Sequence, residues 1–347
     1  MSLKAIKVSG YRGFSTPQTI RFAQPSGKPG SGLTLIVGPN NAGKSSVMEV
    51  LSYLRNPGDA VEFIEGQKNT QTNGRIRIEY HTSEGNFTLQ TTGGGAIKWD
   101  NFPSTKPKIS AYVVPSRRSI EARFSANPEE RSSYVRQSPN FTSRRQTGSR
   151  FSSRLSRIDN EQDKFLECLN RILPNPPSWY MEKSDPGRSE FYLKVTSATS
   201  PHDSDGLGSG VASAIHVADA LYDSPNEDIV GIDEPELSLH PAAQRRLASV
   251  LVELSAYRQI IIATHSPFFA PLECLSSGMM VARVYQRRGG SIVGQLEKVT
   301  AEKVSNLLKD SNNPHVLGLD AREVLFLEDD VILVEGQEDV EVLSIRV

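Results

Sequence analysis

The feature that most constrains this chain is the stretch 33–46, LTLIVGPNNAGKSS, in which a short apolar run leads into a glycine-bounded loop ending in Lys and Ser. Residues 38–45 fit the pattern G-x-x-x-x-G-K-[ST] at every fixed position, between a strand-like and a helix-like stretch. In such a loop, backbone N–H groups surround nucleotide phosphates, and the following helix adds its positive dipole end. The sequence therefore predicts a strand, a phosphate-binding loop and a helix, in that order.

Two side chains of this loop have expected roles in binding a nucleotide and its metal. We expect the Lys44 ammonium to contact the outer phosphates and the Ser45 hydroxyl to ligate Mg²⁺. The residues expected to bind the nucleotide here are Gly38, Pro39, Asn40, Asn41, Ala42, Gly43, Lys44, Ser45 and Ser46.

The composition is typical of a soluble protein. Charged residues make up 23% and apolar residues 37% of the 347 residues. No run approaches the roughly 18 apolar residues that a membrane span needs, and the N-terminus lacks the apolar core of a signal peptide. We expect a cytoplasmic protein with no membrane partner. Cys168 and Cys274 have no second ligand nearby in sequence, so neither a disulfide framework nor a zinc site is indicated.

The order of the predicted elements indicates an α/β fold with a parallel sheet. After the phosphate loop come a glycine turn and helix at 206–222, an apolar strand before residue 233, a helix from 241 and a buried strand ending near 265. Alternating patterns predict antiparallel strands at 3–9 and 18–23, a β-meander within 74–99 and an antiparallel pair within 279–299.

Residues 116–157 differ from the rest of the chain in charge. Between residues 117 and 157 there are ten arginines, no lysine and three glutamates, which give a net charge of +7. One interpretation is a surface that contacts nucleic acid or phosphate. The other, which we favour, is a solvated insertion that carries charge because it joins no core.

Two neighbouring acids, Asp233 and Glu234, end an apolar strand, where a parallel sheet presents its carboxyl ends to a ligand. Neighbouring side chains on a strand point to opposite sides, so the two carboxylates would have separate tasks. We expect Asp233 to hold Mg²⁺ together with Ser45, and Glu234 to accept a proton from the water that attacks the γ-phosphate. His265, at the end of the next strand, would contact the γ-phosphate or that water.

With these motifs the chain resembles the ABC-type ATPase heads of the SMC and RecF-like branch, and within it the OLD (overcoming lysogenization defect) family. The matching stretches are the phosphate loop, LGSGV at 207–211 as the ABC signature, IDEPELSLHP at 232–241 as Walker B plus D-loop, and ATHSPFF at 263–269 as the His switch. YRGF at 11–14 matches the family's N-terminal hairpin, in which Arg12 would approach the ATP. The resemblance implies the fold of an ABC-type P-loop ATPase head over residues 1–325, with a mixed central sheet, an antiparallel β subdomain and flanking helices.

The resemblance also implies a homodimer that closes on ATP, alone or within a higher assembly. The signature residues of one protomer would contact the ATP held by the phosphate loop of the other; they are Leu207, Gly208, Ser209 and Gly210. Gly208 stands where the usual signature has Ser, so either the hydroxyl of Ser209 or backbone amides would supply the contact. The family also carries a glutamine in its Q-loop, for which Gln90 and Gln137 are candidates.

Residues 326–347 resemble the start of a Toprim nuclease domain. The strand-like VILVEG contains Glu335, and Asp339 follows, so these two acids would form part of a nuclease metal site. The Asp-x-Asp pair that the Toprim pattern places later is absent from the eight residues after Asp339, so we expect no nuclease activity from this chain alone. The nuclease would belong to a longer protein or to another subunit; the alternative is an ordinary terminal strand.

The leading hypothesis is a Mg²⁺-dependent ATPase that dimerises on ATP and regulates a DNA-cleaving Toprim nuclease in antiphage defence, with DNA as a partner. The defence role follows from the resemblance alone. One alternative is a RecF- or SMC-like DNA repair ATPase in which the arginine-rich stretch grips DNA. The other is a weakly hydrolysing scaffold held together by ATP.

Overall fold

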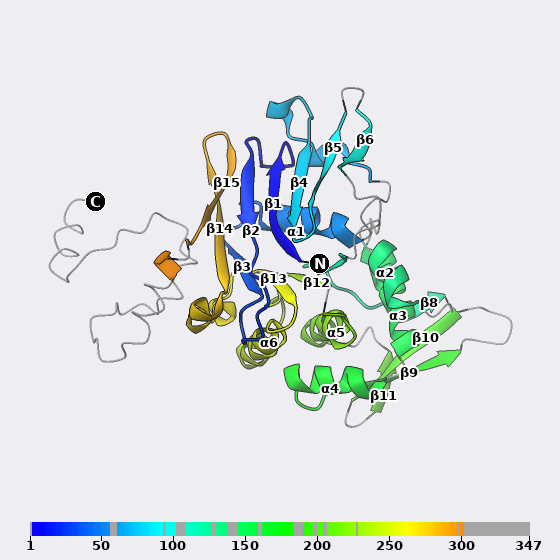
Figure 1. Cartoon of the computed structure of the whole chain (residues 1–347). Coiled ribbons are helices and arrows are strands. Elements are labelled where there is room, and N and C mark those ends of the chain that lie inside the picture. Colours follow the sequence, from blue (N-terminus) through cyan, green and yellow to red (C-terminus); the bar gives the residue numbers. More distant parts are fainter. Residues whose placement is uncertain are drawn as a thin grey trace, which may run out of the picture.

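The computed structural model describes residues 2–55, 61–92, 95–101, 109–125, 129–137, 144–158, 162–183, 190–197, 200–203, 207–226, 228–297 and 299–301 (Figure 1). Glu335 and Asp339, with the whole Toprim-like segment at 326–347, lie outside these residues. The division of the chain into a head over 1–325 and a Toprim-like segment therefore stays a prediction.

A six-stranded sheet forms the centre of the molecule. Its strands are β3 Leu33–Val37, β7 Ala111–Val114, β12 Ile229–Asp233, β13 Gln259–Ala263, β14 Met280–Arg287 and β15 Gly290–Gln295. They lie in the order β15-β14-β3-β13-β12-β7, and all neighbours are parallel except the antiparallel pair β14 and β15. Every residue of β3, β12 and β13 is buried, which explains their almost unbroken apolar sequences.

A second sheet is entirely antiparallel. Its strands are β1 Leu3–Ser9, β2 Gln18–Arg21, β4 Arg77–Thr82, β5 Asn86–Thr91 and β6 Ile97–Asp100. The order is β2-β1-β4-β5-β6, so β1 joins the predicted N-terminal pair and the predicted meander into one sheet. The two sheets confirm the predicted fold class, a mixed central sheet with an antiparallel β subdomain.

Helices complete the fold, together with a small sheet. The helices are α1 Lys44–Ser52, α2 Arg131–Gln137, α3 Arg144–Ile158, α4 Gln162–Ile172, α5 Ser209–Tyr222 and α6 Pro241–Leu254, and the 3-10 helices are η1 Tyr53–Arg55, η2 Glu65–Gln67, η3 Thr70–Thr72, η7 Pro267–Phe269 and η8 Leu272–Ser277. The small sheet contains β8 Arg123–Ser125, β9 Ser178–Lys183, β10 Glu190–Ser197 and β11 Ser200–Asp203. Among the described residues, no helix is both long enough and apolar enough to cross a membrane.

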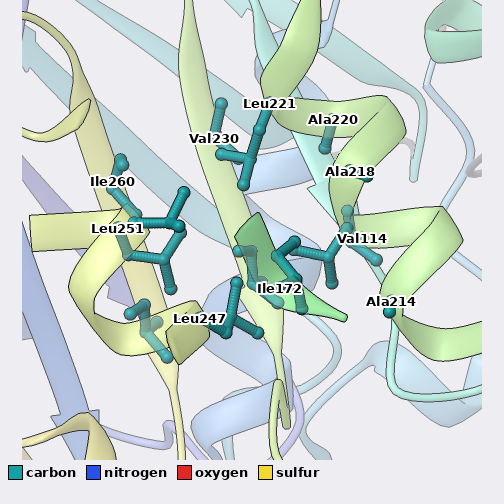
Figure 2. Close-up of a cluster of buried hydrophobic side chains, with 14 of the residues drawn as sticks. Val114, Ile172, Ala214, Ala218, Ala220, Leu221, Val230, Leu247, Leu251 and Ile260 are labelled. Atoms are coloured by element: carbon teal, nitrogen blue, oxygen red, sulfur yellow. The ribbon is translucent and has the colours of Figure 1, made fainter. Parts of the chain in front are cut away.

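The two faces of the central sheet bury two different apolar cores. Ile36 of β3 belongs to the core that contains α1 and the antiparallel sheet. Leu35, its neighbour on the same strand, belongs to the core that contains α4, α5 and α6, because successive side chains of a strand point to opposite faces. Figure 2 shows part of this second core, where Val230 of β12 lies near Leu221 of α5 and Leu251 of α6.

The described part of the stretch 116–157 packs into the second core, so its interpretation as a solvated insertion is wrong. Phe151, Leu155 and Ile158 recur at helical spacing along α3 and are fully buried. Tyr134 of α2 contacts Phe151 in an edge-to-face arrangement. The high charge of the stretch masked this pattern, because one apolar residue in every three or four is enough to bury one face of a helix.

Arg154 of α3 is buried and forms ion pairs with two acids at the C-terminal end of α5. Its Nε lies 3.1 Å from Asp219 Oδ1, and its Nη2 lies 2.8 Å from Asp223 Oδ2. Tyr112 of β7 donates to Asp219 Oδ2, and Arg131 Nη1 lies 2.6 Å from Asp223 Oδ1. Burial raises the pKa of Asp219, and the two arginines oppose that rise. Arginines of this stretch therefore attach α2 and α3 to α5.

Removal of the buried cation should destabilise the fold. Arg154→Ala is expected to lower the free energy of unfolding by about 3 kcal/mol, because it leaves the buried Asp219 carboxylate without its ion-pair partner on α3. Urea unfolding followed by circular dichroism measures this loss. In the control Arg171→Ala, an exposed pair with Glu253 is removed, and a loss below about 1 kcal/mol is expected. Equal losses in the two variants would contradict the role given to Arg154.

Candidate functional site

The phosphate loop of residues 38–45 joins β3 to α1. Gly38 has a φ of 141°, and a Cβ on it would lie 1.9 Å from the carbonyl oxygen of Val284 on β14, so glycine is required there. The Lys44 ammonium donates to the carbonyl oxygens of Gly38 and Pro39 at 2.9 and 2.8 Å. Burial lowers the pKa of Lys44. The loop thus surrounds the Lys44 ammonium. Phosphate oxygens of a bound nucleotide can replace the two carbonyl oxygens as partners of this ammonium.

The β14–β15 hairpin supports this loop from outside. Gln286 donates to the carbonyl oxygen of Asn41 at 3.0 Å, and the Ser291 hydroxyl donates to that of Ala42 at 2.7 Å. The Ser291 N–H donates to the carbonyl oxygen of Gly13 at 2.7 Å, which connects the N-terminal YRGF hairpin to the same place. Sequence reasoning missed Gln286 and Ser291, because no local pattern separates them from other polar residues of a hairpin.

Asp233 ends β12 and has the properties of a metal ligand. The residue is only 6% exposed, and burial raises its pKa to about 6, while a hydrogen bond with Ser45 opposes that rise. Within the described part of the chain, Asp233 Oδ1 is buried and has no hydrogen-bond partner. An unpaired carboxylate oxygen beside a hydroxyl fits Mg²⁺, which typically binds through one or two carboxylates together with phosphate oxygens and water. The predicted pairing of Ser45 with Asp233 is therefore compatible with the geometry.

The expectation that Glu234 also ends the strand is wrong, because β12 stops at Asp233. Glu234 opens the turn after β12 in a left-handed conformation, with a φ of 50°, which residues with a side chain rarely adopt. Its N–H donates to the carbonyl oxygen of Ala263 on β13 at 2.8 Å. Its carboxylate Oε1 lies 4.0 Å from Nε2 of His265, and both side chains are partly exposed. The structure thus brings the predicted base and the predicted His together, although they are far apart in sequence.

Glu236 and Arg118 hold the turn after β12, and the sequence analysis assigned a role to neither. The Glu236 carboxylate accepts hydrogen bonds from the His265 N–H at 2.6 Å and from the Thr264 hydroxyl at 2.8 Å. Arg118 lies four residues after β7 and donates to the two carbonyl oxygens of the turn that begins at Asp233. The available sequence signals were weak: a second acid in DEPE and an arginine close to a strand end.

The signature residues lie at the start of α5. Gly208 is its N-cap and Ser209 its first residue, and both are exposed; Leu207 just before them is partly buried. A Cβ on Gly210 would lie 2.4 Å from the carbonyl oxygen of Ser238, so this end of α5 packs closely on the D-loop. Their contact with the ATP of a second copy stays a prediction.

The sequence also pointed to Arg12 and to two candidate Q-loop glutamines, Gln90 and Gln137. Arg12 pairs with Glu49 of α1, with its Nε 2.7 Å from Oε2, and its approach to the nucleotide stays a prediction. Gln90 is on β5 and donates to Asp100, and Gln137 ends α2. None of the hydrogen bonds found for these two glutamines in the described residues reaches the phosphate loop.

Comparison with known proteins agrees with this arrangement. Residues 33–270 match the family described as "AAA domain, putative AbiEii toxin, Type IV TA system". The chain belongs to this AAA family. The matched region runs from β3 past the His switch, so it contains the phosphate loop, the signature, the Walker B turn and His265.

Two curated relatives extend the match. Old nuclease of Escherichia phage P2 is 26% identical over 249 residues, which cover 68% of this chain and 40% of the relative. Septu protein PtuA of Bacillus thuringiensis is 23% identical over 365 residues, which cover 94% of this chain and 87% of the relative. The chain therefore spans less than half the length of Old nuclease.

A solved structure supports the same fold. The chain is similar to the crystal structure of an Smc head bound to the C-winged helix domain of ScpA. The match covers 87% of this chain and 100% of the Smc head chain, with a TM-score of 0.56 and 13% identity. At this identity the similarity concerns the fold alone. Together with the family and Old nuclease matches, it confirms the resemblance to OLD-family ABC-type ATPases with an SMC-like head.

The raised pKa of Asp233 predicts a pH-dependent stability of the ligand-free protein. Since its folded-state pKa of about 6 exceeds the ordinary value of 3.8, the folded protein binds the proton more tightly, and this stabilisation is lost as the pH rises through 6. At pH 8, Asp233→Asn should therefore have a free energy of unfolding roughly 2 kcal/mol higher than that of wild type, as measured by urea unfolding. The difference should be smaller at pH 4.5. A difference that does not change with pH would contradict the assignment.

Proposed function

We propose that this protein is a Mg²⁺-dependent ATPase whose catalytic site is complete only when two copies close around ATP. The proposal rests on the meeting of the phosphate loop with the ends of β12 and β13 at one edge of the central sheet. Lys44 would neutralise the outer phosphates, and Ser45 and Asp233 would hold Mg²⁺, which when bound polarises phosphate oxygens. Glu234 would take the proton of the attacking water, and His265 would orient that water or the γ-phosphate.

Dimerisation belongs to the proposal because the signature end of α5 is open to a partner. Gly208 and Ser209 are exposed, and a helix N-terminus attracts anions. In the head-to-tail arrangement of ABC-type ATPases, this end would contact the ATP of the second copy. ATP would favour the closed dimer only through contacts made in that state, and hydrolysis would remove them.

We propose further that the head regulates a Toprim nuclease that cuts DNA, in antiphage defence. The support is the similarity to Old nuclease and the resemblance of residues 326–347 to the start of a Toprim domain. The nuclease would lie in the same polypeptide or in a partner subunit. ATP-driven closure of the heads would then control the access of DNA to the nuclease.

Glu234→Gln should stop hydrolysis without preventing ATP binding. The amide cannot accept a proton from the attacking water, so phosphate release is expected to fall at least about 100-fold. With ATP and Mg²⁺, this variant should accumulate as dimers, as measured by size-exclusion chromatography with light scattering. Lys44→Ala is the matched control, which should lose nucleotide binding and remain monomeric.

Unchanged turnover in Glu234→Gln would refute the assignment of the base. A wild-type protein that binds ATP and dimerises, yet releases no more phosphate than Glu234→Gln, would be the ATP-dependent scaffold instead. The two measurements therefore separate the ATPase from its non-hydrolysing alternative.

The exposed arginines of the 116–157 stretch are the remaining candidates for contact with DNA, since Arg118, Arg131 and Arg154 bind protein groups. The double variant with Arg117→Gln and Arg136→Gln, both at exposed positions, should bind duplex DNA more weakly. Its slope of log affinity against log salt should flatten by about 1 to 2, because each lost phosphate contact contributes about 0.9. Arg75 and Arg288, exposed elsewhere, provide the matched control pair. An unaltered slope would exclude this surface from DNA binding.

A further inference from the structure

Arg118 lies between the catalytic turn and the signature helix. It follows β7, which pairs in parallel with β12, so the two strands end at the same edge of the sheet. Its Nη2 donates to the carbonyl oxygens of Asp233 at 2.5 Å and Glu234 at 3.1 Å. Its Nη1 donates to the hydroxyl of Ser213 on α5, and its Nε donates to the carbonyl oxygen of Pro115 at 2.9 Å. One guanidinium group thus joins the end of β7, the turn after β12 and α5.

Ser213 places this contact close to the signature. It is buried and lies about one helical turn after Ser209, the first residue of α5. A displacement of the signature end of α5 therefore carries Ser213 with it. At the other side of Arg118, Glu234 has a strained left-handed backbone that persists only while its surroundings hold it.

We propose that Arg118 is a positioning residue that transmits the position of α5 to the catalytic turn. The inference rests on the proposed ATP dimer, in which α5 of each copy contacts the ATP held by the other. ATP on the partner's phosphate loop would fix α5, and through Ser213 and Arg118 would set the backbone of Glu234 for activation of water in the same copy. The two sites of the dimer would then hydrolyse ATP cooperatively.

Arginine suits this position for geometric reasons. Its planar fork offers five donors in fixed directions and here serves four oxygen acceptors, whereas a lysine ammonium offers three donors around a point charge. Burial lowers the pKa of Arg118 to about 10, so the group remains charged at neutral pH. Arg118→Lys would therefore keep the charge and lose the bridging geometry.

Ser213→Ala tests the link with the least disturbance, because it removes the contact of Arg118 with α5 and leaves its contacts with the turn. Hydrolysis by the full chain with Mg²⁺ is measured over a range of ATP concentrations, and binding is measured separately with a fluorescent ATP analogue. We expect wild type to have a Hill coefficient above unity. In Ser213→Ala, kcat should fall about tenfold and the Hill coefficient should fall to unity. The Kd for the analogue should stay within about twofold of wild type. Arg118→Lys should give the same pattern.

Ser224→Ala is the matched control. Ser224 accepts a hydrogen bond from Arg131 at 2.6 Å beyond the C-terminal end of α5, far along the helix from the signature. This variant should retain the kcat and Hill coefficient of wild type.

Four results would overturn the link while leaving the proposed ATPase intact. They are wild-type kinetics in Ser213→Ala, a loss confined to ATP affinity, an equal loss in Ser224→Ala, and non-cooperative hydrolysis by the wild-type dimer. Absence of hydrolysis in the wild type would instead overturn the proposed function, and the link with it.

Discussion

The parallel strands of the central sheet end at a common edge, and each part of the proposed catalytic site depends on that alignment. Asp233 of β12 lies opposite Ala263 of β13, and Ala263 lies opposite Ile36 of β3. The residues that follow are therefore brought together: the phosphate loop after β3, Glu234 after β12 and His265 after β13. A shift of one residue in either pairing would turn these side chains to the opposite face. Strand register, enforced by two buried faces, is thus what assembles the site.

The buried Arg154 fixes the position of α3 relative to α5. For Arg154 and Asp219, the cost of removing both charges from water offsets much of their attraction, so the pair contributes little net stability. A different position of α3 on α5 would, however, leave one charge buried without a partner, which costs several kcal/mol. The pair therefore disfavours alternative positions of α3 more than it stabilises the native one. This selection of one position explains why a buried arginine occurs in a stretch whose apolar face already packs on the core.

Local patterns were sufficient to predict elements whose chemistry lies in neighbouring residues. The phosphate loop and the strand that ends at Asp233, with Glu234 directly after it, each carry their signals within a few positions. Contacts between distant segments could not be predicted from local patterns. Two examples are the pairing of β1 with β4 and the hydrogen bonds of Arg118 to backbone carbonyls. A backbone acceptor exists at every residue, so it leaves no mark in the sequence. At 116–157 net charge was the wrong guide, because burial depended on a few apolar residues such as Phe151, and the buried Arg154 pairs with acids of α5.

Two contacts attach α5 to the turn after β12 and to the loop that continues from it to Ser238. At Gly210 the helix lies directly against the carbonyl oxygen of Ser238, and Ser238 and Glu234 at the two ends of this loop both have left-handed backbones, with φ of 63° and 50°. At Ser213 the helix is joined through Arg118 to the turn itself. Close packing at one point and a guanidinium bridge at another join α5 to the turn after β12 and the loop beyond it, as one packed unit. Such units change between discrete arrangements rather than bending gradually. Coupling between the two proposed ATP sites would therefore proceed by a rigid shift of α5, not by local bending of the signature.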